Sequence, residues 1–405
     1  MENLKWIFTS LLLIALLAEG APSTEAIFEN FWNESKKNIY EFKRKKTFFS
    51  DSNYDLLKKR AKKARDVYQL SGPINDFLNS MNVSHTHFYT DHDFEFYFLR
   101  SLFVTRDISN PKVHHVGAQF KLTDSGYVIR EVLKNYPAQQ ASLQRGDVIL
   151  SCNDKPFHPV TSFADGKSSY RLKVRRRKNL LTTTVSPVHE SPHQSFLNAM
   201  NTSSRTITFK KKTFGYIRLW TGTNQKILDS FTKLVKEKFL DVDGLILDLR
   251  GGFGGAWYDY LDPFFESRKD YFQWIAIDKE GQRSSGGPDQ KNYNWYYKGP
   301  MVVLINEGVR SGKESLAYQF KKSKRATLIG EKTAGAFTAG LAVFTDPSLN
   351  YFLYLATGEM LLDGNRIEGV GVVPDVQVPY PLLNAPDEDP QLAKAIEVIK
   401  RKMRE

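Results

Sequence analysis

Cysteine is nearly absent from the sequence, and long apolar runs are rare. A single cysteine, Cys152, occurs among 405 residues, so no internal disulfide can form. A chain of this length can build a sufficient hydrophobic core without one. Cys152 ends the strand-like run 148–152, which disfavours a role as a thiol nucleophile. After residue 18 no run is apolar enough to cross a bilayer, and the chain has neither an internal repeat nor a low-complexity tract.

The histidines do not form a metal-binding pattern. His85, His87 and His92 lie close together and His114 precedes His115, but neither group has the spacing of a known zinc motif. Isolated histidines more often pack in the interior or face water than bind a metal. The sequence therefore predicts no metal site, and we expect no cofactor.

The chain is basic, with a formal net charge of +12, and its basic residues are spread along the sequence. The one dense run, residues 171–178, alternates at first with apolar residues and so predicts an exposed strand and turn. We do not expect nucleic acid as a partner. An anionic membrane or envelope surface, or an acidic substrate, suits the charge equally well.

The N-terminus has the pattern of an export signal. Residues 1–20 contain Lys5, an apolar run at 6–18 that is short for a membrane span, and small residues near Gly20. We predict a cleaved signal peptide at 1–20 and an exported protein, periplasmic or extracellular. An uncleaved N-terminal anchor is the alternative.

The segment 301–322 carries the first chemical signal. An apolar run at 301–305 predicts a buried strand, a turn follows, and 314–322 has the spacing of a helix. Ser311 therefore lies on a strand-to-helix turn, where helix N–H groups point at the same place. A nucleophile with oxyanion donors would be built this way. A simple helix cap is the alternative for Ser311.

A second signal is the segment 244–255, GLILDLRGGFGG. Its apolar run at 245–249 predicts another buried strand, followed by glycines whose N–H groups can approach a ligand closely. An ordinary Gly-rich connection would have the same composition. The spacing does not match a dinucleotide-binding fingerprint.

Together, the two segments resemble the C-terminal processing, or tail-specific, serine peptidase family, with its D-L-R-x-N-x-G-G and S-x-x-E motifs. The resemblance implies that Ser311 is the nucleophile and that the amides of Gly255 and Gly312 form the oxyanion hole. Gly252 stands where the family usually has asparagine.

The resemblance also implies the domain organisation of an α+β multidomain protein. It consists of an N-terminal helical region at 26–105, a PDZ-like domain at 111–187 and an α/β serine peptidase core of the ββα type at 206–405. Within these regions the residue pattern predicts a helix at 55–68 and a short one at 76–81. It also predicts a polar linker at 189–205 and an aromatic-rich insertion at 257–300, which either roofs the active site or is a packed loop.

The PDZ resemblance implies a site for substrate C-termini. A PDZ domain adds an extended peptide to its sheet and holds the terminal carboxylate with backbone amides. The matching loop and first strand consist of Val116, Gly117, Ala118, Gln119 and Phe120. A PDZ-shaped spacer is the alternative.

The general base is the open question, because Ala336 occupies the position of the family's lysine. Histidine-using, tricorn-like branches of the clan imply His85 as base, Glu368 as the carboxylate that orients it, and Ser84 as an assistant. A relocated lysine, Lys332 or Lys313, is a second hypothesis.

The resemblance is closest to the tricorn-like branches, and the function it implies is that of an exported serine endopeptidase acting on protein or peptide substrates. The alternative is a catalytically inactive scaffold of the same fold that binds peptides or apolar ligands. A nucleic-acid binder has no fold signature behind it.

Overall fold

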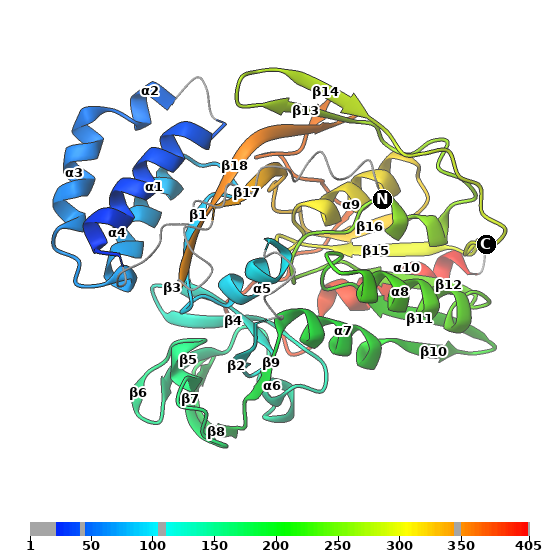
Figure 1. Cartoon of the computed structure of the whole chain (residues 1–405). Coiled ribbons are helices and arrows are strands. Elements are labelled where there is room, and N and C mark those ends of the chain that lie inside the picture. Colours follow the sequence, from blue (N-terminus) through cyan, green and yellow to red (C-terminus); the bar gives the residue numbers. More distant parts are fainter. Residues whose placement is uncertain (1–21, 41–44, 104–110, 344–349, 404–405) are drawn as a thin grey trace. The chain divides into compact units, whose positions relative to one another are not determined.

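The computed structural model describes residues 22–40, 45–103, 111–343 and 350–403 (Figure 1). The chain divides into two compact units. Unit 1 combines residues 1–110, 273–286 and 336–368, and unit 2 combines residues 111–272, 287–335 and 369–405. The predicted signal peptide at 1–20 lies outside the described residues.

Unit 1 opens with helices, but the helix predicted for 55–68 is wrong. The chain leaves the helix after Ala61, and the side chain of Asp66 then accepts a hydrogen bond from the amide of Gln69, which caps a new helix. The predicted short helix at 76–81 is the end of that longer one. The helices described in this unit are α1 (Thr24–Asn38), α2 (Lys45–Phe48), α3 (Asp51–Ala61), α4 (Val67–Ser80) and α5 (Phe94–Phe103).

The sheet of unit 1 is assembled from distant parts of the chain. Its order is β1-β18-β13-β14, and β17 and β19 also pair with β18. The aromatic-rich insertion is therefore not just a packed loop, because it supplies the β13–β14 hairpin. The strands are β1 (His87–Thr90), β13 (Trp274–Asp278), β14 (Arg283–Gly286), β17 (Thr338–Val343), β18 (Tyr351–Leu362) and β19 (Asn365–Arg366).

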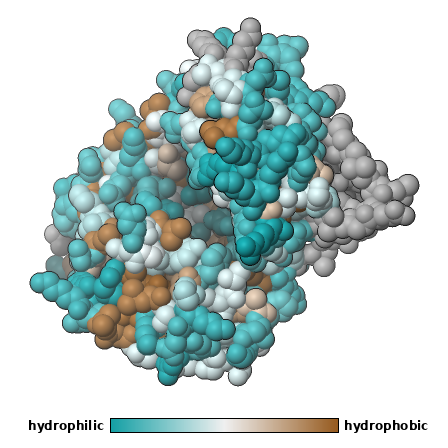
Figure 2. All heavy atoms as spheres, turned by 90° about the vertical axis from the view of Figure 1, so that its left-hand side faces the viewer, coloured by the Kyte–Doolittle hydropathy of each residue, from teal (hydrophilic) through white to brown (hydrophobic). Residues whose placement is uncertain are grey.

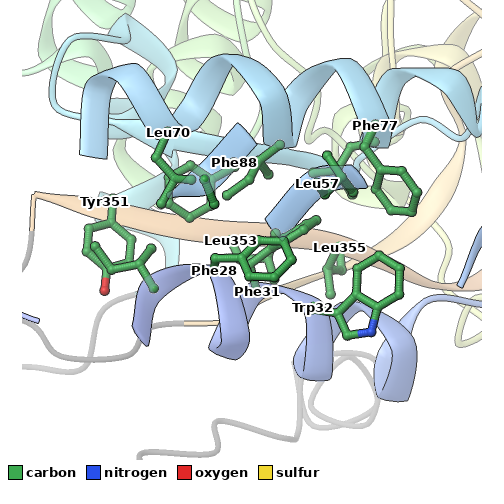
Figure 3. Close-up of a cluster of buried hydrophobic side chains, with 14 of the residues drawn as sticks. Phe28, Phe31, Trp32, Leu57, Leu70, Phe77, Phe88, Tyr351, Leu353 and Leu355 are labelled. Carbon is green, nitrogen blue, oxygen red and sulfur yellow. The ribbon is translucent and has the colours of Figure 1, made fainter. Parts of the chain in front are cut away.

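A cluster of buried aromatic and aliphatic side chains joins these helices to the sheet. In Figure 3, side chains of α1 and α4 meet beside strand β18. Burying one such side chain contributes about 1.5–3 kcal/mol, so the cluster holds β1 and β18 firmly against the helices. The labelled members are Phe28, Phe31, Trp32, Leu57, Leu70, Phe77, Phe88, Tyr351, Leu353 and Leu355.

The loop between α4 and β1 is anchored at its far end. Asn75 of α4 accepts from the amide of Phe88 at 2.8 Å and donates to its carbonyl oxygen at 2.9 Å. This two-way pairing ties β1 to α4. The short loop between them, which carries Ser84 and His85, therefore has little freedom.

Among its described residues, unit 2 contains two larger sheets and one two-stranded sheet, and the first of the larger sheets lies in the region predicted to be PDZ-like. Its strand order is β3-β4-β5-β7-β8, with β6 paired to β5. The basic run 171–178 forms a strand and turn, as predicted. Its elements are β3 (Ala118–Thr123), β4 (Gly126–Val132), α6 (Pro137–Gln140), β5 (Val148–Cys152), β6 (Lys155–Pro156), β7 (Tyr170–Arg176) and β8 (Asn179–Val185).

This domain exposes large apolar side chains. On the face seen in Figure 2, hydrophobic atoms gather in the lower part of the view among hydrophilic ones. Leu180, on β8, is 74% exposed. The other exposed leucines of the domain are Leu122, Leu150 and Leu181.

The second sheet of unit 2 has the order β10-β11-β12-β15-β16-β20, and from β11 onward neighbouring strands are parallel. Strands β12 and β15 are buried throughout. Their in-register pairing brings their carboxyl ends to one edge. The elements are β10 (Arg205–Phe209), β11 (Lys212–Arg218), α8 (Gln225–Lys233), β12 (Gly244–Asp248), β15 (Met301–Ile305), α9 (Gly312–Lys322), β16 (Thr327–Gly330), β20 (Val376–Gln377) and α10 (Pro390–Lys402).

The polar linker predicted at 189–205 is wrong. This segment begins in strand β9 (Val188–Glu190) and continues as helix α7 (Pro192–Ser203). Ser191 caps the helix by accepting from the amide of Gln194, and Pro192 occupies its first turn. Proline suits that position because its missing N–H would have no partner there.

Among the residues that the structure describes, no helix is both long and apolar enough to span a membrane.

Strand β9 pairs with β2 (Val113–His115), which carries a buried histidine. The amide of Gly117 donates to Nδ1 of His115 at 3.0 Å, and Nε2 lies 3.0 Å from the hydroxyl of Ser195, which in turn donates to Glu190. With Nδ1 accepting, the ring is neutral. Burial lowers the pKa of His115 to about 4, and it does the same for His87 and His193.

We expect stability to fall as the pH drops from neutrality toward 4. In the unfolded chain these histidines bind protons near pH 6.5, whereas in the folded chain burial keeps them neutral down to about pH 4. Acid therefore lowers the free energy of unfolding by about 2–3 kcal/mol per histidine. Denaturant unfolding at pH 7 and pH 4.5 measures the loss. His115→Asn keeps an acceptor for the Gly117 amide and should reduce this loss of stability. The same substitution at the partly buried His114 should leave the loss unchanged. An equal loss in wild type and His115→Asn would contradict the assignment.

Candidate active site

The turn after β15 holds Ser311 in an unusual backbone conformation. Asn306 organises the turn: its side-chain oxygen accepts from the amide of Gly308 at 2.9 Å. Ser311 then has φ 54° and ψ −135° at the N-cap position of α9. A non-glycine residue in this region costs about 1–3 kcal/mol and persists only where its surroundings enforce it. The side chain is partly exposed, although α9 behind it is buried.

Glu314, one turn into α9, enforces that conformation. Its buried carboxylate accepts from the amide of Ser311 at 3.2 Å, from the hydroxyl of Thr333 at 2.6 Å and from the amide of Gly335 at 2.8 Å. The glutamate of the S-x-x-E motif thus ties the serine turn to the loop after β16. Both segments belong to unit 2.

A buried ion pair at the end of β12 fixes the start of the glycine loop, residues 251–255. Asp248 accepts from both Nε and Nη2 of Arg250, at 2.9 and 2.8 Å, and Arg250 also pairs with Asp389. The positive charges of Arg250 and Arg218 overcome the effect of burial and hold the pKa of Asp248 far below its usual range. The pair therefore stays ionised and fixes the start of the loop.

The glycine loop and the serine turn touch where a side chain would not fit. A Cβ on Gly254 would lie 2.5 Å from the Cβ of Ser311. A Cβ on Gly312 would lie 2.3 Å from the carbonyl oxygen of Gly255. In the described chain the backbone N–H groups of Gly255 and Gly312 donate to no other protein group. Two donors thus remain beside the serine.

A second polar cluster lies in unit 1 and contains the remaining residues of the histidine hypothesis. The carboxylate of Glu368 accepts from the amide of Ser84 at 2.9 Å, from its hydroxyl at 2.8 Å and from the amide of Phe337 at 2.7 Å. The Ser84 hydroxyl lies 2.9 Å from Nδ1 of His85. Glu368 therefore reaches the histidine through Ser84, and His85, like Ser311, has a positive φ, of 53°.

The network determines the tautomer of His85. The proton of the Ser84 hydroxyl goes to Glu368, and the hydroxyl of Thr338 donates to the carbonyl of Ser84 at 3.2 Å. Both hydroxyl oxygens, at 2.9 and 3.0 Å from Nδ1, are then left to accept. We infer from this network that Nδ1 carries the proton. Nε2 is then the unprotonated nitrogen, as a general base requires.

The two candidate lysines have very different surroundings. Lys332 is exposed, and its side chain runs past Gly371. Lys313 is fully buried, and its Nζ donates to main-chain carbonyls. Ala336, at the position of the family's lysine, is partly buried.

The predicted carboxylate-binding loop is partly engaged within its own domain. The amide of Gly117 donates to His115, its carbonyl accepts from Leu133, and the carbonyl of Val116 accepts from Ala138. Ala118 and Phe120 pair with β4 as part of β3. The binding of substrate C-termini by this loop stays a prediction.

Gln119 has a contact that the sequence did not suggest. Its side-chain oxygen accepts from the amide of Gly252 at 2.6 Å, so β3 touches the glycine loop directly. Glu131 of the neighbouring strand accepts from Arg218 of β11 at 2.6 Å. Arg218 and Arg250 lower the pKa of Glu131 despite its burial. The PDZ-like sheet is thus bonded to the peptidase-like sheet within unit 2.

Sequence reasoning missed Thr338 and the contacts of Gln119 and Lys313. Thr338 follows the lysine position by two residues but matches no motif. Its partner Ser84 is 254 residues away, so only the fold reveals the contact.

Among the described residues, no group of three or more histidine, cysteine, aspartate or glutamate side chains is arranged to hold a metal ion.

Comparison with known proteins identifies two families in the chain. The sequence profile of peptidase family S41 matches residues 213–378, and that of the PDZ domain matches residues 115–186. The first segment runs from β11 to β20 and holds the glycine loop, Ser311 and Glu368. The second contains β3 to β8. The predicted fold class, with a PDZ domain and a serine peptidase core, is confirmed.

Individual relatives are distant. The tricorn protease of Thermoplasma volcanium is 22% identical over 414 residues, which cover 95% of this chain and 37% of the relative. The chloroplastic C-terminal processing peptidase of Tetradesmus obliquus is 27% identical over 266 residues, covering 60% and 54%. The matches thus span about a third and about half of these two relatives.

Among solved structures, the photosystem II D1 C-terminal processing protease superposes with a TM-score of 0.55 at 20% identity, covering 94% of this chain and 98% of that one. At this identity the likeness concerns the fold. The two profiles confirm the resemblance drawn from the sequence: residues 213–378 match peptidase family S41, and a segment that matches the PDZ domain precedes them.

Proposed function

We propose that the protein is a serine endopeptidase in which Ser311 attacks the scissile carbonyl and His85 is the general base. Nε2 of His85 takes the serine proton as the tetrahedral intermediate forms, and later delivers it to the leaving amine. The amides of Gly255 and Gly312 donate to the oxyanion. The proposal requires the polar clusters of the two units to act together on one substrate.

The observation that carries this proposal is the network around His85. The hydroxyl oxygens of Ser84 and Thr338 both lie within hydrogen-bond distance of Nδ1, and Glu368 accepts from the Ser84 hydroxyl. When the ring gains a proton, Glu368 stabilises the positive charge through the Ser84 hydroxyl. The Ser84 hydroxyl donates to Glu368 and the Thr338 hydroxyl donates to the carbonyl of Ser84, so both oxygens are able to accept from Nδ1. A histidine with only a packing role would not need this arrangement.

A lysine base has less support. Lys332 is exposed, so it lacks the burial that a lysine base requires. Each group that Nζ of Lys313 contacts is a carbonyl oxygen, so the nitrogen acts as a hydrogen-bond donor. It is therefore badly placed to accept a proton from Ser311. The free amides of Gly255 and Gly312 also favour an enzyme over an inactive scaffold for peptides or apolar ligands.

The substrates in this proposal are proteins or peptides of the exported compartment, periplasmic or extracellular. The N-terminal pattern at 1–20 supports export, and the PDZ loop at 116–120 supports delivery of substrates by their C-termini. The contact of Gln119 with Gly252 would place the delivering strand next to the oxyanion loop.

The decisive experiment compares cleavage of an unfolded protein by the purified chain and by its variants. Ser311→Ala should abolish turnover without unfolding the protein. His85→Ala should lower kcat by about 10²–10⁴-fold, the usual contribution of a general base. Glu368→Gln should act in the same direction, because it weakens the charge behind Ser84.

Lys332→Ala serves as the matched control and should leave turnover unchanged. Full activity of His85→Ala, together with loss of activity in Lys332→Ala, would replace the histidine with a lysine base. Absence of turnover in the wild type would favour the binding scaffold, and binding of C-terminal peptides or lipids would then be measured.

We also propose an anionic membrane surface as a partner of the PDZ domain. The β7–β8 hairpin places Arg175 opposite Leu180, and Lys178 lies in the turn between the strands. Leu180 is largely exposed, and Lys178 is exposed as well. A leucine beside basic side chains suits the boundary between lipid headgroups and acyl chains.

Sedimentation with lipid vesicles tests this partner. Binding to phosphatidylcholine mixed with phosphatidylglycerol should exceed binding to phosphatidylcholine alone and should weaken as salt is added. Lys178→Ala should reduce the affinity about fivefold, since one basic residue contributes about 1 kcal/mol near such a surface. Lys37→Ala, an exposed lysine of α1, is the control. Equal binding to both vesicle types would exclude an electrostatic partner of this kind.

A further inference from the structure

Lys313 is a buried lysine in an environment of main-chain oxygens. It lies two residues after Ser311 in the first turn of α9 and has no solvent exposure. Its Nζ donates to the carbonyl oxygens of Gly251 at 2.5 Å, Leu249 at 2.9 Å, Trp220 at 3.1 Å and Leu219 at 3.4 Å. Within the described chain no carboxylate forms an ion pair with it.

The four carbonyls come from two places that matter for the site. Leu219 and Trp220 follow the end of β11, whereas Leu249 and Gly251 follow the end of β12 and open the glycine loop. Trp220 is also bonded to that loop, because its carbonyl accepts from the amide of Phe253 at 2.9 Å. Lys313 is therefore a junction between two strand ends, the glycine loop and the helix that follows Ser311.

The hydrogen-bond partners of Nζ require a donor at this position. Burial and the positive charge of Arg218 lower the pKa of Lys313 well below its ordinary value. The carbonyl oxygens act in the opposite direction, because they accept hydrogen bonds and the protonated form has three donors to give. With an acceptor at each contact, Nζ can serve as a donor but is badly placed to accept a proton from Ser311.

We infer that Lys313 is a positioning residue for the oxyanion hole. By binding Leu249 and Gly251 from within α9, it fixes the start of the glycine loop relative to the helix. The amide of Gly255, on that loop, is thereby held at a set distance from the amide of Gly312, on that helix. This inference rests on the proposed function and assigns Lys313 a part in it other than that of the base.

Lys313→Met tests the inference, because methionine is of similar length but has no donor. We expect KM for a peptide substrate to change little and kcat to fall about 10²–10³-fold, the loss usual when an oxyanion donor is removed. A peptide boronic acid, whose serine adduct places an oxygen in the oxyanion hole, should lose affinity by a similar factor. The same peptide with a carboxamide end should bind as before.

The pH profile separates positioning from base catalysis. With His85 as base, the residual activity of Lys313→Met should keep the pH dependence of the wild type. A lost or shifted limb of that profile would overturn the inference in favour of a lysine base. Lys321→Met, the same substitution at an exposed lysine later on α9, is the matched control and should keep wild-type kcat.

Amide hydrogen exchange gives a readout that does not depend on turnover. Lys313→Met should speed exchange in residues 251–256 more than elsewhere in unit 2, and Lys321→Met should not. Unchanged exchange with unchanged kcat would refute the inference and leave the proposed function intact. A wild type without turnover would refute the proposed function, and exchange alone would then decide the role of Lys313 in the loop.

The Lys313→Met substitution leaves several buried carbonyl oxygens without a donor, which destabilises the folded protein. Where Lys313→Met does not fold, Lys313→Gln carries the same measurements. Glutamine keeps an amide donor at shorter reach, so its effects should be smaller and of the same sign. Wild-type kcat and exchange in Lys313→Gln would contradict the inference.

Discussion

The parallel pairing of β12 with β15 is the constraint on which the serine site depends. The two strands are adjacent, in register and buried, so the segments that follow them leave the sheet at one edge. One segment is the glycine loop and the other is the turn with Ser311. Their closest approach, at Gly254 and Gly312, leaves no room for a side chain. Loops of this kind, far apart in sequence, meet because the sheet brings their starting points together.

Much of unit 2 could be predicted because its signals are local. The apolar run at 301–305 forms a buried strand with those bounds, and the run at 245–249 differs from β12 by one residue at each end. The S-x-x-E spacing is also local, because Glu314 binds the amide of Ser311 within one helical turn. By contrast, the linker predicted at 189–205 became α7, since a serine followed by proline is as typical of a helix start as of a loop.

The rest of the site depends on partners that are distant in the chain, which a single sequence does not reveal. Thr338 contacts Ser84 across 254 residues, and Gln119 contacts Gly252 across 133. Lys313 is one of the two lysines that the sequence offered as a relocated base. Its actual partners are strand ends 62 to 94 residues away. The residue type alone left its role open, and only the carbonyls around Nζ distinguish a donor from a base.

Two buried glutamates have the same part in the two units. Ser311 and His85 both have positive φ values, of 54° and 53°, which carry a conformational cost. The carboxylate of Glu314 accepts hydrogen bonds from the amides of Ser311 and Gly335. The carboxylate of Glu368 accepts from the amides of Ser84 and Phe337.

Each carboxylate also anchors one end of the segment 335–337, Glu314 at the amide of Gly335 and Glu368 at the amide of Phe337. That segment contains Ala336, where the family's lysine would stand. Glu314 binds the strained Ser311 directly, and Glu368 binds Ser84, the neighbour of the strained His85. Strained residues persist only where their surroundings enforce them, and the bonds made by Glu314 and Glu368 supply that enforcement beside Ser311 and His85, which supports the catalytic roles proposed for both.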